Sequence, residues 1–167
     1  IYKDEDSVAK QWINWGADGW RLDVANEVDT IFWNDFRVEM KAHNENTLIL
    51  GEIWDDASKY FIGDQYDSVM NYRIRAALID YLKNGNATRL NDTLMAVYED
   101  YPEEAFYALM NLMGSHDVAR AIYILGGGSD SSERAELGSY DENLGKQRLK
   151  LAALFEFGYA GAPTIYY

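Results

Sequence analysis

Three carboxylates in this 167-residue chain stand where parallel sheets place catalytic groups. Asp23, Glu52 and Asp117 each follow a run of residues that predicts a β-strand. The carboxyl ends of parallel strands gather on one rim of an α/β fold, so the three acids should lie close together. Repulsion and burial then favour the neutral form of at least one acid. A protonated acid beside an ionised one is the pair that cleavage of a glycosidic bond requires.

Neighbouring residues indicate how the acids would divide these roles. Arg21 stands two residues before Asp23 on the same strand face, and its guanidinium would keep Asp23 ionised as a nucleophile. Glu52 lies between a glycine and two apolar residues, so it is the better candidate for the acid that holds its proton. His116 could hydrogen-bond a sugar hydroxyl. The pattern alone leaves two other interpretations open, a structural Arg21–Asp23 ion pair and solvated loop charges in an acidic protein.

Hydrophobic periodicity predicts an α/β fold around these acids. Short connections and right-handed crossovers favour a parallel sheet with helices outside it. Trp12 and Trp15 are expected in the core, and residues 126–145 are expected to form a long loop because they are rich in Gly, Ser and acids. Strands are expected over residues 19–24, 47–54, 66–71, 106–114 and 162–167, and helices over 7–15, 30–44, 73–83, 88–101 and 146–157.

The composition restricts the classes of partner. The chain carries 28 acids against 15 bases, a formal net charge of -13. Nucleic acids and anionic membranes attract basic surfaces, so neither is expected as a partner. No apolar run approaches the roughly 18 residues that a membrane span needs. With 48% hydrophobic and 26% charged residues, the composition is that of a globular domain with a sizeable core.

Three segments together resemble a known enzyme family. Residues 16–24 read Gly-Ala-Asp-Gly-Trp-Arg-Leu-Asp-Val, residues 49–54 read Ile-Leu-Gly-Glu-Ile-Trp, and residues 112–117 read Leu-Met-Gly-Ser-His-Asp. They resemble the second, third and fourth signature regions of the α-amylase family, glycoside hydrolase family 13, in the family's order. Residues 161–167 resemble the family's eighth barrel strand.

This resemblance implies a fold and a role for each residue. The chain would form strands four to eight, with their helices, of a (β/α)8 TIM barrel. Residues 1–167 would then be the C-terminal part of a catalytic barrel, truncated at both ends. By resemblance, Asp23 is the nucleophile, Glu52 the general acid/base and Asp117 the transition-state stabiliser. Arg21 and His116 would be their supporting pair.

A finer resemblance is to the neopullulanase, cyclomaltodextrinase and maltogenic amylase group. Residues 24–27, Val-Ala-Asn-Glu, resemble that group's second region, which makes Asn26 and Glu27 candidates for substrate binding. Ser115 stands where asparagine is commoner in the wider family. Trp54 is a candidate platform for a sugar ring, and packing at the barrel top is its alternative interpretation.

The family's first signature region, which supplies an Asp and a His to the sugar site and an Asn to a structural calcium, is absent from this sequence. We therefore expect no metal ligand in this segment and no cofactor that it requires, while calcium stays open for a complete protein. The chain begins with Ile1, and nothing there resembles a signal peptide. We expect a cytoplasmic protein and leave an extracellular one open.

The expected function is that of a retaining α-glucan hydrolase acting by double displacement. Its partner would be an α-glucan oligosaccharide such as cyclodextrin, pullulan or a maltooligosaccharide. The enzyme would cleave α-1,4 bonds, and cleavage of α-1,6 bonds is a further possibility. Two alternatives remain, a non-catalytic amylase-like binding or scaffold protein and an inactive fragment of the enzyme. Open sheet edges would also let the chain form a homodimer.

Overall fold

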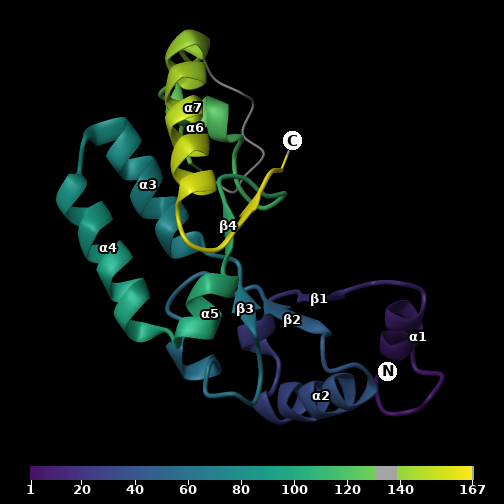
Figure 1. Ribbon diagram of the computed structural model, residues 1–167. Coiled ribbons are helices and arrows are strands. Elements are labelled where there is room, and N and C mark those ends of the chain that lie inside the picture. The colour runs from purple at the N-terminus through teal and green to yellow at the C-terminus, as the bar shows by residue number, and fades with distance from the viewer. Residues whose placement is uncertain (131–138, 167) are drawn as a thin grey trace. The chain divides into compact units, whose positions relative to one another are not determined.

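The computed structural model describes residues 1–130 and 139–166 (Figure 1). The described chain divides into two compact units. The first unit comprises Ile1–Met70 and Asp100–Leu109, and the second comprises Asn71–Glu99 and the residues from Met110 onward.

The first unit contains a three-stranded parallel sheet in the order β1-β2-β3. Gly19 pairs with Leu48 at the start of β1 and Leu22 pairs with Gly51 at its end, while Leu50 pairs with Ser68 of β3. The elements are α1 (Val8–Asn14), β1 (Gly19–Leu22), the 3-10 helix η1 (Ala25–Glu27), α2 (Thr30–His43), β2 (Leu48–Gly51), the 3-10 helix η2 (Ser58–Tyr60), β3 (Ser68–Val69) and α5 (Glu103–Ala108).

The second unit contains the parallel pair β4-β5 and four helices of its described residues. Its core forms where α3, α6 and α7 meet, around the buried residues Leu78, Ile124, Leu125 and Ala152. The elements are α3 (Tyr72–Asn84), α4 (Ala87–Asp100), β4 (Met110–Leu112), α6 (Ala121–Leu125), α7 (Glu142–Gly158) and β5 (Ala162–Thr164).

Side-chain caps fix where three of the helices begin. Asp29 accepts from the backbone N–H of Ile31 before α2, and Asp141 accepts from that of Leu144 at the start of α7. The Asn71 side chain caps α3 in the same way. Such caps satisfy backbone donors that the first turn of a helix leaves without a partner.

The helical and strand predictions are confirmed for most segments, although β1, β2 and β3 are shorter than the strands predicted over residues 19–24, 47–54 and 66–71. Two other segments are partly wrong in type. The strand predicted over residues 106–114 is wrong in its first half, because Glu103–Ala108 forms α5 and only Met110–Leu112 pairs as β4. The loop predicted over residues 126–145 is wrong in its last part, because α7 begins at Glu142. Residues 131–138 of that loop lie outside the described residues. The five strands form a three-stranded and a two-stranded ladder rather than one five-stranded ladder.

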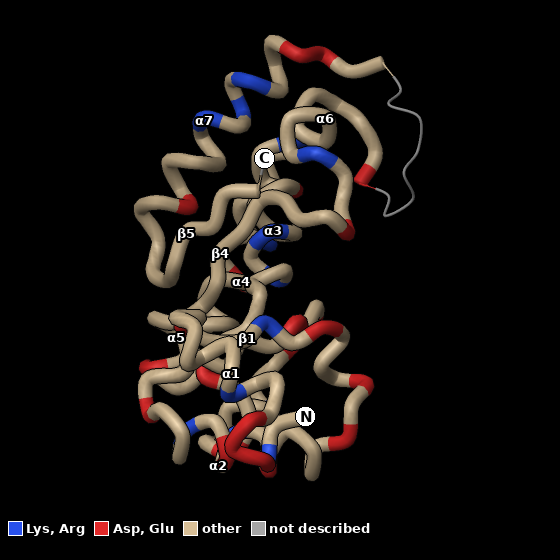
Figure 2. The backbone as a smooth tube through the Cα atoms, turned by 90° about the vertical axis from the view of Figure 1, so that its right-hand side faces the viewer, with Lys and Arg blue, Asp and Glu red and all other residues tan. Residues whose placement is uncertain are grey.

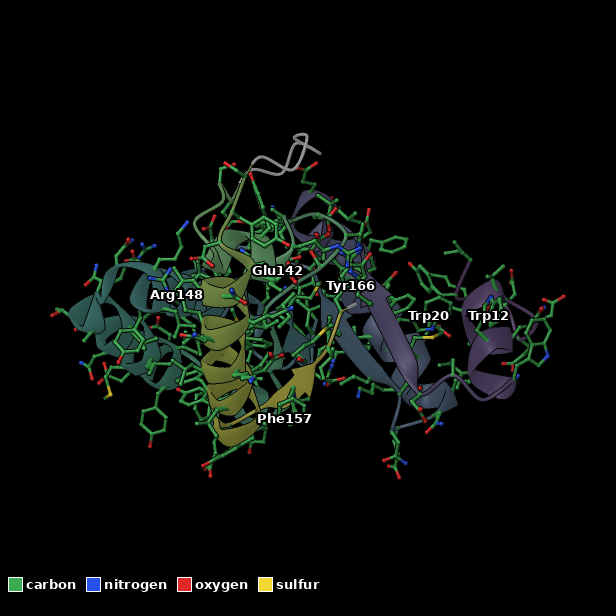
Figure 3. The ribbon with its side chains drawn as sticks, turned by 90° about the horizontal axis from the view of Figure 1, so that it is seen from above. Trp12, Trp20, Glu142, Arg148, Phe157 and Tyr166 are labelled. Atoms are coloured by element: carbon green, nitrogen blue, oxygen red, sulfur yellow. The ribbon has the colours of Figure 1, made fainter. Side chains whose placement is uncertain are left out.

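The prediction that Trp12 and Trp15 belong to the core is also wrong. Trp12 is 50% exposed and Trp15 is 70% exposed. Helix α1 instead buries Ala9 and Ile13, and the two indoles contact each other edge to face, with ring centroids 5.2 Å apart. Figure 3 labels Trp12 on this helix and Trp20 on β1.

Acidic residues occur along both units, as the red segments of Figure 2 show. Within the described part of the chain, no helix is long and apolar enough to cross a membrane.

One partly buried acid ties α2 to the sheet of the first unit. Asp67, just before β3, accepts hydrogen bonds from Arg37 at 2.7 Å and Lys41 at 2.8 Å, both on α2. It also accepts from the backbone N–H of Ile49 on β2 at 2.9 Å. Burial opposes ionisation, but the hydrogen bonds from Lys41, Arg37 and Ile49 outweigh it, so the pKa of Asp67 lies below its ordinary value.

We therefore expect Asp67→Asn to lower the free energy of unfolding at pH 7 by about 2 kcal/mol, because two partly buried cations lose their counterion. The lowered pKa means that the contribution of Asp67 is complete above the pKa of the unfolded carboxyl, about 3.9. That contribution is lost as the pH falls through the folded value.

Urea unfolding between pH 3 and 7 measures both effects. Asp35→Asn is the matched control, since Asp35 pairs with Lys3 at the surface and should change stability little. Equal losses for the two variants at pH 7 would contradict the role given to Asp67.

Candidate active site

The register of the first sheet sets Asp23 beside Glu52. Leu22 pairs with Gly51 at the ends of β1 and β2, and the backbone N–H of Glu52 donates to the carbonyl of Leu22 at 3.0 Å. Because the strands are parallel and in this register, the residues that follow them, Asp23 after β1 and Glu52 after β2, lie at the same edge of the sheet. The sequence prediction that these two acids follow neighbouring strands is confirmed.

A close approach of an aromatic ring explains the glycine before Glu52. A Cβ atom on Gly51 would lie 3.0 Å from Cδ2 of the Tyr66 ring, which is tighter than ordinary packing. Tyr66 is buried and its hydroxyl donates to the carbonyl of Ala25 at 3.2 Å. Glycine at position 51 therefore allows the ring to reach the turn that follows Asp23.

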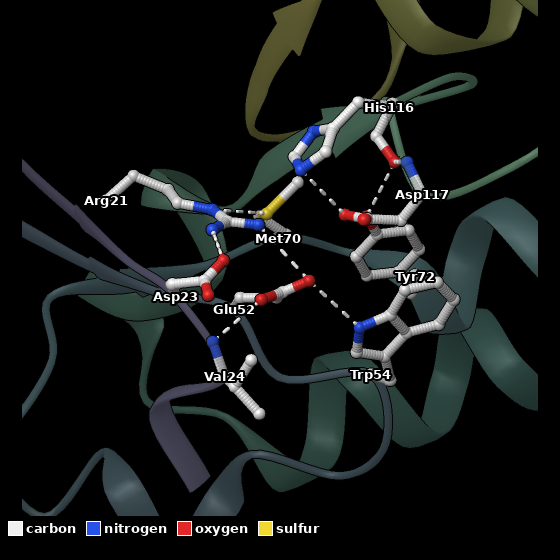
Figure 4. A network of polar contacts seen from close by, with 10 residues as sticks. Arg21, Asp23, Val24, Glu52, Trp54, Met70, Tyr72, His116 and Asp117 are labelled. Atoms are coloured by element: carbon white, nitrogen blue, oxygen red, sulfur yellow. Dashed lines mark hydrogen bonds and ion pairs between the residues drawn. The ribbon is translucent and has the colours of Figure 1, made fainter. Parts of the chain in front are cut away.

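The guanidinium of Arg21 contacts both carboxylates (Figure 4). Its Nη1 donates to Oδ1 of Asp23, and its Nη2 forms an ion pair with Oε1 of Glu52 at 3.1 Å. Its Nε also donates to Sδ of Met70 at 3.5 Å. The sequence predicted only the contact with Asp23. The observed bridge places one positive charge between two acids that would otherwise repel each other.

The two acids differ sharply in exposure. The Glu52 side chain is 5% exposed, whereas that of Asp23 is 75% exposed. Glu52 is held on both oxygens, because Oε1 accepts from the Trp54 indole at 3.1 Å and Oε2 accepts from the backbone N–H of Val24 at 2.8 Å. One acid is thus fixed in a buried setting and the other is open to a ligand.

The remaining predicted residues of the first unit lie nearby in the chain. Asn26 and Glu27 belong to η1 and are exposed. Trp54 is 43% exposed. Its indole could offer a face to a sugar ring while its N–H is bonded to Glu52. The structure therefore brings Arg21, Asp23, Glu52 and Trp54 together around one carboxylate.

The second unit holds the other two predicted residues as a pair. Nε2 of His116 lies 3.3 Å from Oδ2 of Asp117. The loop is fixed by Ser115, whose Oγ accepts from the backbone N–H of Asp117 at 3.2 Å and forms a hydrogen bond with the Tyr72 hydroxyl at 2.9 Å. Ser115 and Tyr72 are both buried, so this hydroxyl pair anchors the exposed His116 and the half-buried Asp117.

Three groups that contact the site residues were not predicted as site members from the sequence. The backbone N–H of Val24, the sulfur of Met70 and the Tyr72 hydroxyl all contact predicted site residues or their anchors. Tyr72 ends residues 64–72, Asp-Gln-Tyr-Asp-Ser-Val-Met-Asn-Tyr, which resemble the sixth strand of the neopullulanase group. That resemblance is the only sequence signal that included Tyr72. A backbone donor carries no side-chain signal at all.

Among the described residues, no cluster of three or more His, Cys, Asp or Glu side chains could hold a metal ion.

A comparison with protein families decides the classification of this chain. The family described as alpha amylase, catalytic domain, matches residues 1–167. The chain belongs to the alpha-amylase family. The predicted fold class, a partial (β/α)8 barrel with α/β architecture, is confirmed by this match and by the likeness to solved members of the family.

Three members of the family show which enzymes this chain is similar to. Neopullulanase 2 of Thermoactinomyces vulgaris is 43% identical over 162 residues, which are 96% of this chain and 25% of that protein. Amylopullulanase of Thermoanaerobacter thermohydrosulfuricus is 40% identical over 185 residues, which cover all of this chain and 12% of that protein. A solved cyclomaltodextrinase is 38% identical, with a TM-score of 0.79 over 95% of this chain and 25% of its own.

These names confirm the predicted similarity to the neopullulanase and cyclomaltodextrinase group. The chain spans only 12% of the amylopullulanase and 25% of the neopullulanase, so it corresponds to a part of these relatives.

The bridging role of Arg21 predicts strong energetic coupling between Arg21 and Glu52. In a double-mutant cycle of Arg21→Met and Glu52→Gln, each single change leaves a buried or half-buried charge with fewer partners, and the double change removes both charges. We expect a coupling free energy of about 1–3 kcal/mol, measured by urea unfolding.

The matched control is the same cycle, Lys146→Met and Glu142→Gln, on an ion pair of α7 whose side chains are both more than half exposed. Its coupling should be much smaller. A coupling of Arg21 with Glu52 that is no larger than this control would contradict the bridge.

Proposed function

We propose that this chain acts as part of a longer retaining α-glucan hydrolase in which Asp23 is the nucleophile and Glu52 the general acid/base. The observation that carries the proposal is the contact of one guanidinium, that of Arg21, with both carboxylates. Membership of the alpha-amylase family supports it independently.

The proposed reaction has two displacements. In the first, an Asp23 oxygen forms a bond to the anomeric carbon while the bond from that carbon to the leaving oxygen breaks, and Glu52 gives its proton to that oxygen. In the second, water attacks the same carbon and gives a proton to Glu52, and the ester bond to Asp23 breaks. Asp23 and Glu52 thus return to their starting states, and the anomeric configuration is retained.

Retention is proposed from the family membership, and it requires the two acids to lie close together. Retaining enzymes hold their two carboxyl groups roughly 5–5.5 Å apart, whereas inverting enzymes leave about 6.5–9.5 Å for a water molecule between them. In this chain the two terminal nitrogens of one guanidinium contact the two carboxylates, so both acids lie beside the same group. The exposure of Asp23 also suits the group that must reach the sugar carbon.

We assign the other predicted residues supporting roles. Asp117 would stabilise the positive charge that develops on the sugar, and His116 would hydrogen-bond a sugar hydroxyl. Asn26, Glu27 and Trp54 would contact the glucan, the last by stacking. The chemistry needs no cofactor from this segment, since carboxyl groups alone carry both steps, and calcium would belong to the complete protein.

The proposed substrates are α-glucan oligosaccharides with α-1,4 bonds, and with α-1,6 bonds as a second type. The support is the names of the relatives, which include amylopullulanase, neopullulanase and cyclomaltodextrinase. The proposal of a longer protein rests on the small share of these relatives that the chain covers. We also propose that the isolated chain forms a homodimer through the edges of its outermost strands, because strand edges pair readily with another chain.

We expect Asp23→Asn in the complete protein to lower kcat for maltooligosaccharide hydrolysis by about 10⁴–10⁶, the scale seen when a catalytic nucleophile is lost. Asp35→Asn, at an exposed acid on α2, is the control and should leave kcat unchanged. Proton NMR of the first product formed by the unchanged protein should show the α-anomer.

Two results would count against the proposal. One is an Asp23→Asn protein that keeps a tenth or so of the activity. The other is an unchanged protein with no glycosidase activity on any α-glucan, which would favour the non-catalytic binding protein.

A further inference from the structure

The turn directly after Asp23 contains a costly backbone conformation. Val24 has φ 42° and ψ 46°, in the left-handed region, and among residues 1–130 and 139–166 it is the only non-glycine residue with positive φ. A β-branched residue in this region is a genuine outlier, because its Cβ substituents crowd the backbone. Glycine or asparagine would adopt the same conformation at lower cost.

Packing of the valine side chain does not explain its presence. Val24 is 40% exposed, so much of its apolar surface gains nothing from burial. A strained conformation persists only where its surroundings impose it, and such residues cluster at functional sites.

Three side chains form hydrogen bonds with the backbone of this turn. The N–H of Val24 donates to Oε2 of Glu52 at 2.8 Å. The next carbonyl, that of the fully buried Ala25, accepts from the Trp33 indole at 2.8 Å and from the Tyr66 hydroxyl at 3.2 Å. The partners come from the residue that follows β2, from α2 and from the loop before β3, so three separate segments contact one turn.

We propose that Val24 is a positioning residue for Asp23. The left-handed conformation turns the chain sharply after Asp23 and aims the Val24 N–H at Glu52, so that Glu52 contacts the segment on either side of Asp23 through Arg21 and Val24. An L-residue leaves a narrow left-handed well, which restricts the direction of the Asp23 carboxylate, whereas glycine would leave a broad one. This inference rests on the proposed function, in which Asp23 must attack along one direction.

One substitution distinguishes a positioning role of Val24 from a purely structural one, because the two roles predict different changes in stability and in kcat. Val24→Gly removes the strain but keeps the N–H, so it should raise the midpoint of thermal unfolding by about 2–4 °C. The same change should lower kcat about tenfold, with KM within about twofold, because the broader well misdirects Asp23. Val24→Ala keeps the narrow well and should hold kcat within about threefold of the unchanged protein.

The matched control is Val28→Gly in the same complete protein. Val28 is 39% exposed, like Val24, but has φ -93° and ψ 142°, an ordinary extended conformation. Glycine there should lower the unfolding midpoint and leave kcat nearly unchanged, because it adds only freedom to the unfolded chain.

Two outcomes would overturn the inference. One is a fall of the unfolding midpoint on Val24→Gly, as at Val28, and the other is an unchanged kcat. Asp23→Asn in the same assay distinguishes failure of the proposed function from failure of the inference about Val24. If that protein stays active, the proposed function fails, while the opposite midpoint shifts of the two glycine variants still decide whether Val24 is strained.

Discussion

The contact of Arg21 with Asp23 and Glu52 is the interaction on which the proposed site depends. Two carboxylates at neighbouring strand ends repel each other, and Glu52 is almost fully removed from water. One guanidinium offsets both costs, because its planar fork presents separate nitrogens to separate acids. A lysine would supply the same charge at a single point. The sheet register, the glycine before Glu52 and the turn after Asp23 all serve to bring these three side chains to one place.

Glu52 connects this ion pairing to the backbone. Its two oxygens accept from Trp54 and from the N–H of Val24, so the buried acid also shapes the turn that carries the exposed one. At Val24 the strained conformation costs stability, and the proposed function benefits from it because it orients the neighbouring nucleophile. In the second unit, side-chain hydroxyls hold the backbone of the site residue. There a buried pair of hydroxyls, Tyr72 and Ser115, fixes the backbone N–H of Asp117.

The sequence predicted a strand before Asp23 and the Arg21–Asp23 contact from a local pattern of period two. It predicted a strand at Glu52 from a continuous apolar run. It did not predict that Arg21 also reaches Glu52, since that contact depends on strand register, which is a long-range property. The apolar residues 106–114 predict one strand, but short apolar runs fit a strand and a helix alike, and the first half is helical. Trp12 and Trp15 are large apolar residues and so predict a core position, yet α1 buries its other face. The left-handed Val24 has no signature in a sequence, because valine is the wrong residue for it.

The central claim is that Asp23 forms a covalent bond to the sugar while Glu52 handles the proton. Covalent trapping tests it most directly. The complete protein would be incubated with a 5-fluoro-α-glucosyl fluoride, which forms the glycosyl ester readily and hydrolyses it slowly, and then digested for mass spectrometry of the peptides. With Asp23 as the nucleophile, we expect one glucosyl adduct, on the peptide that contains Asp23, and none after Asp23→Asn. An adduct on Glu52 or Asp117, or turnover of α-glucans with inverted products and no adduct, would contradict this role of Asp23.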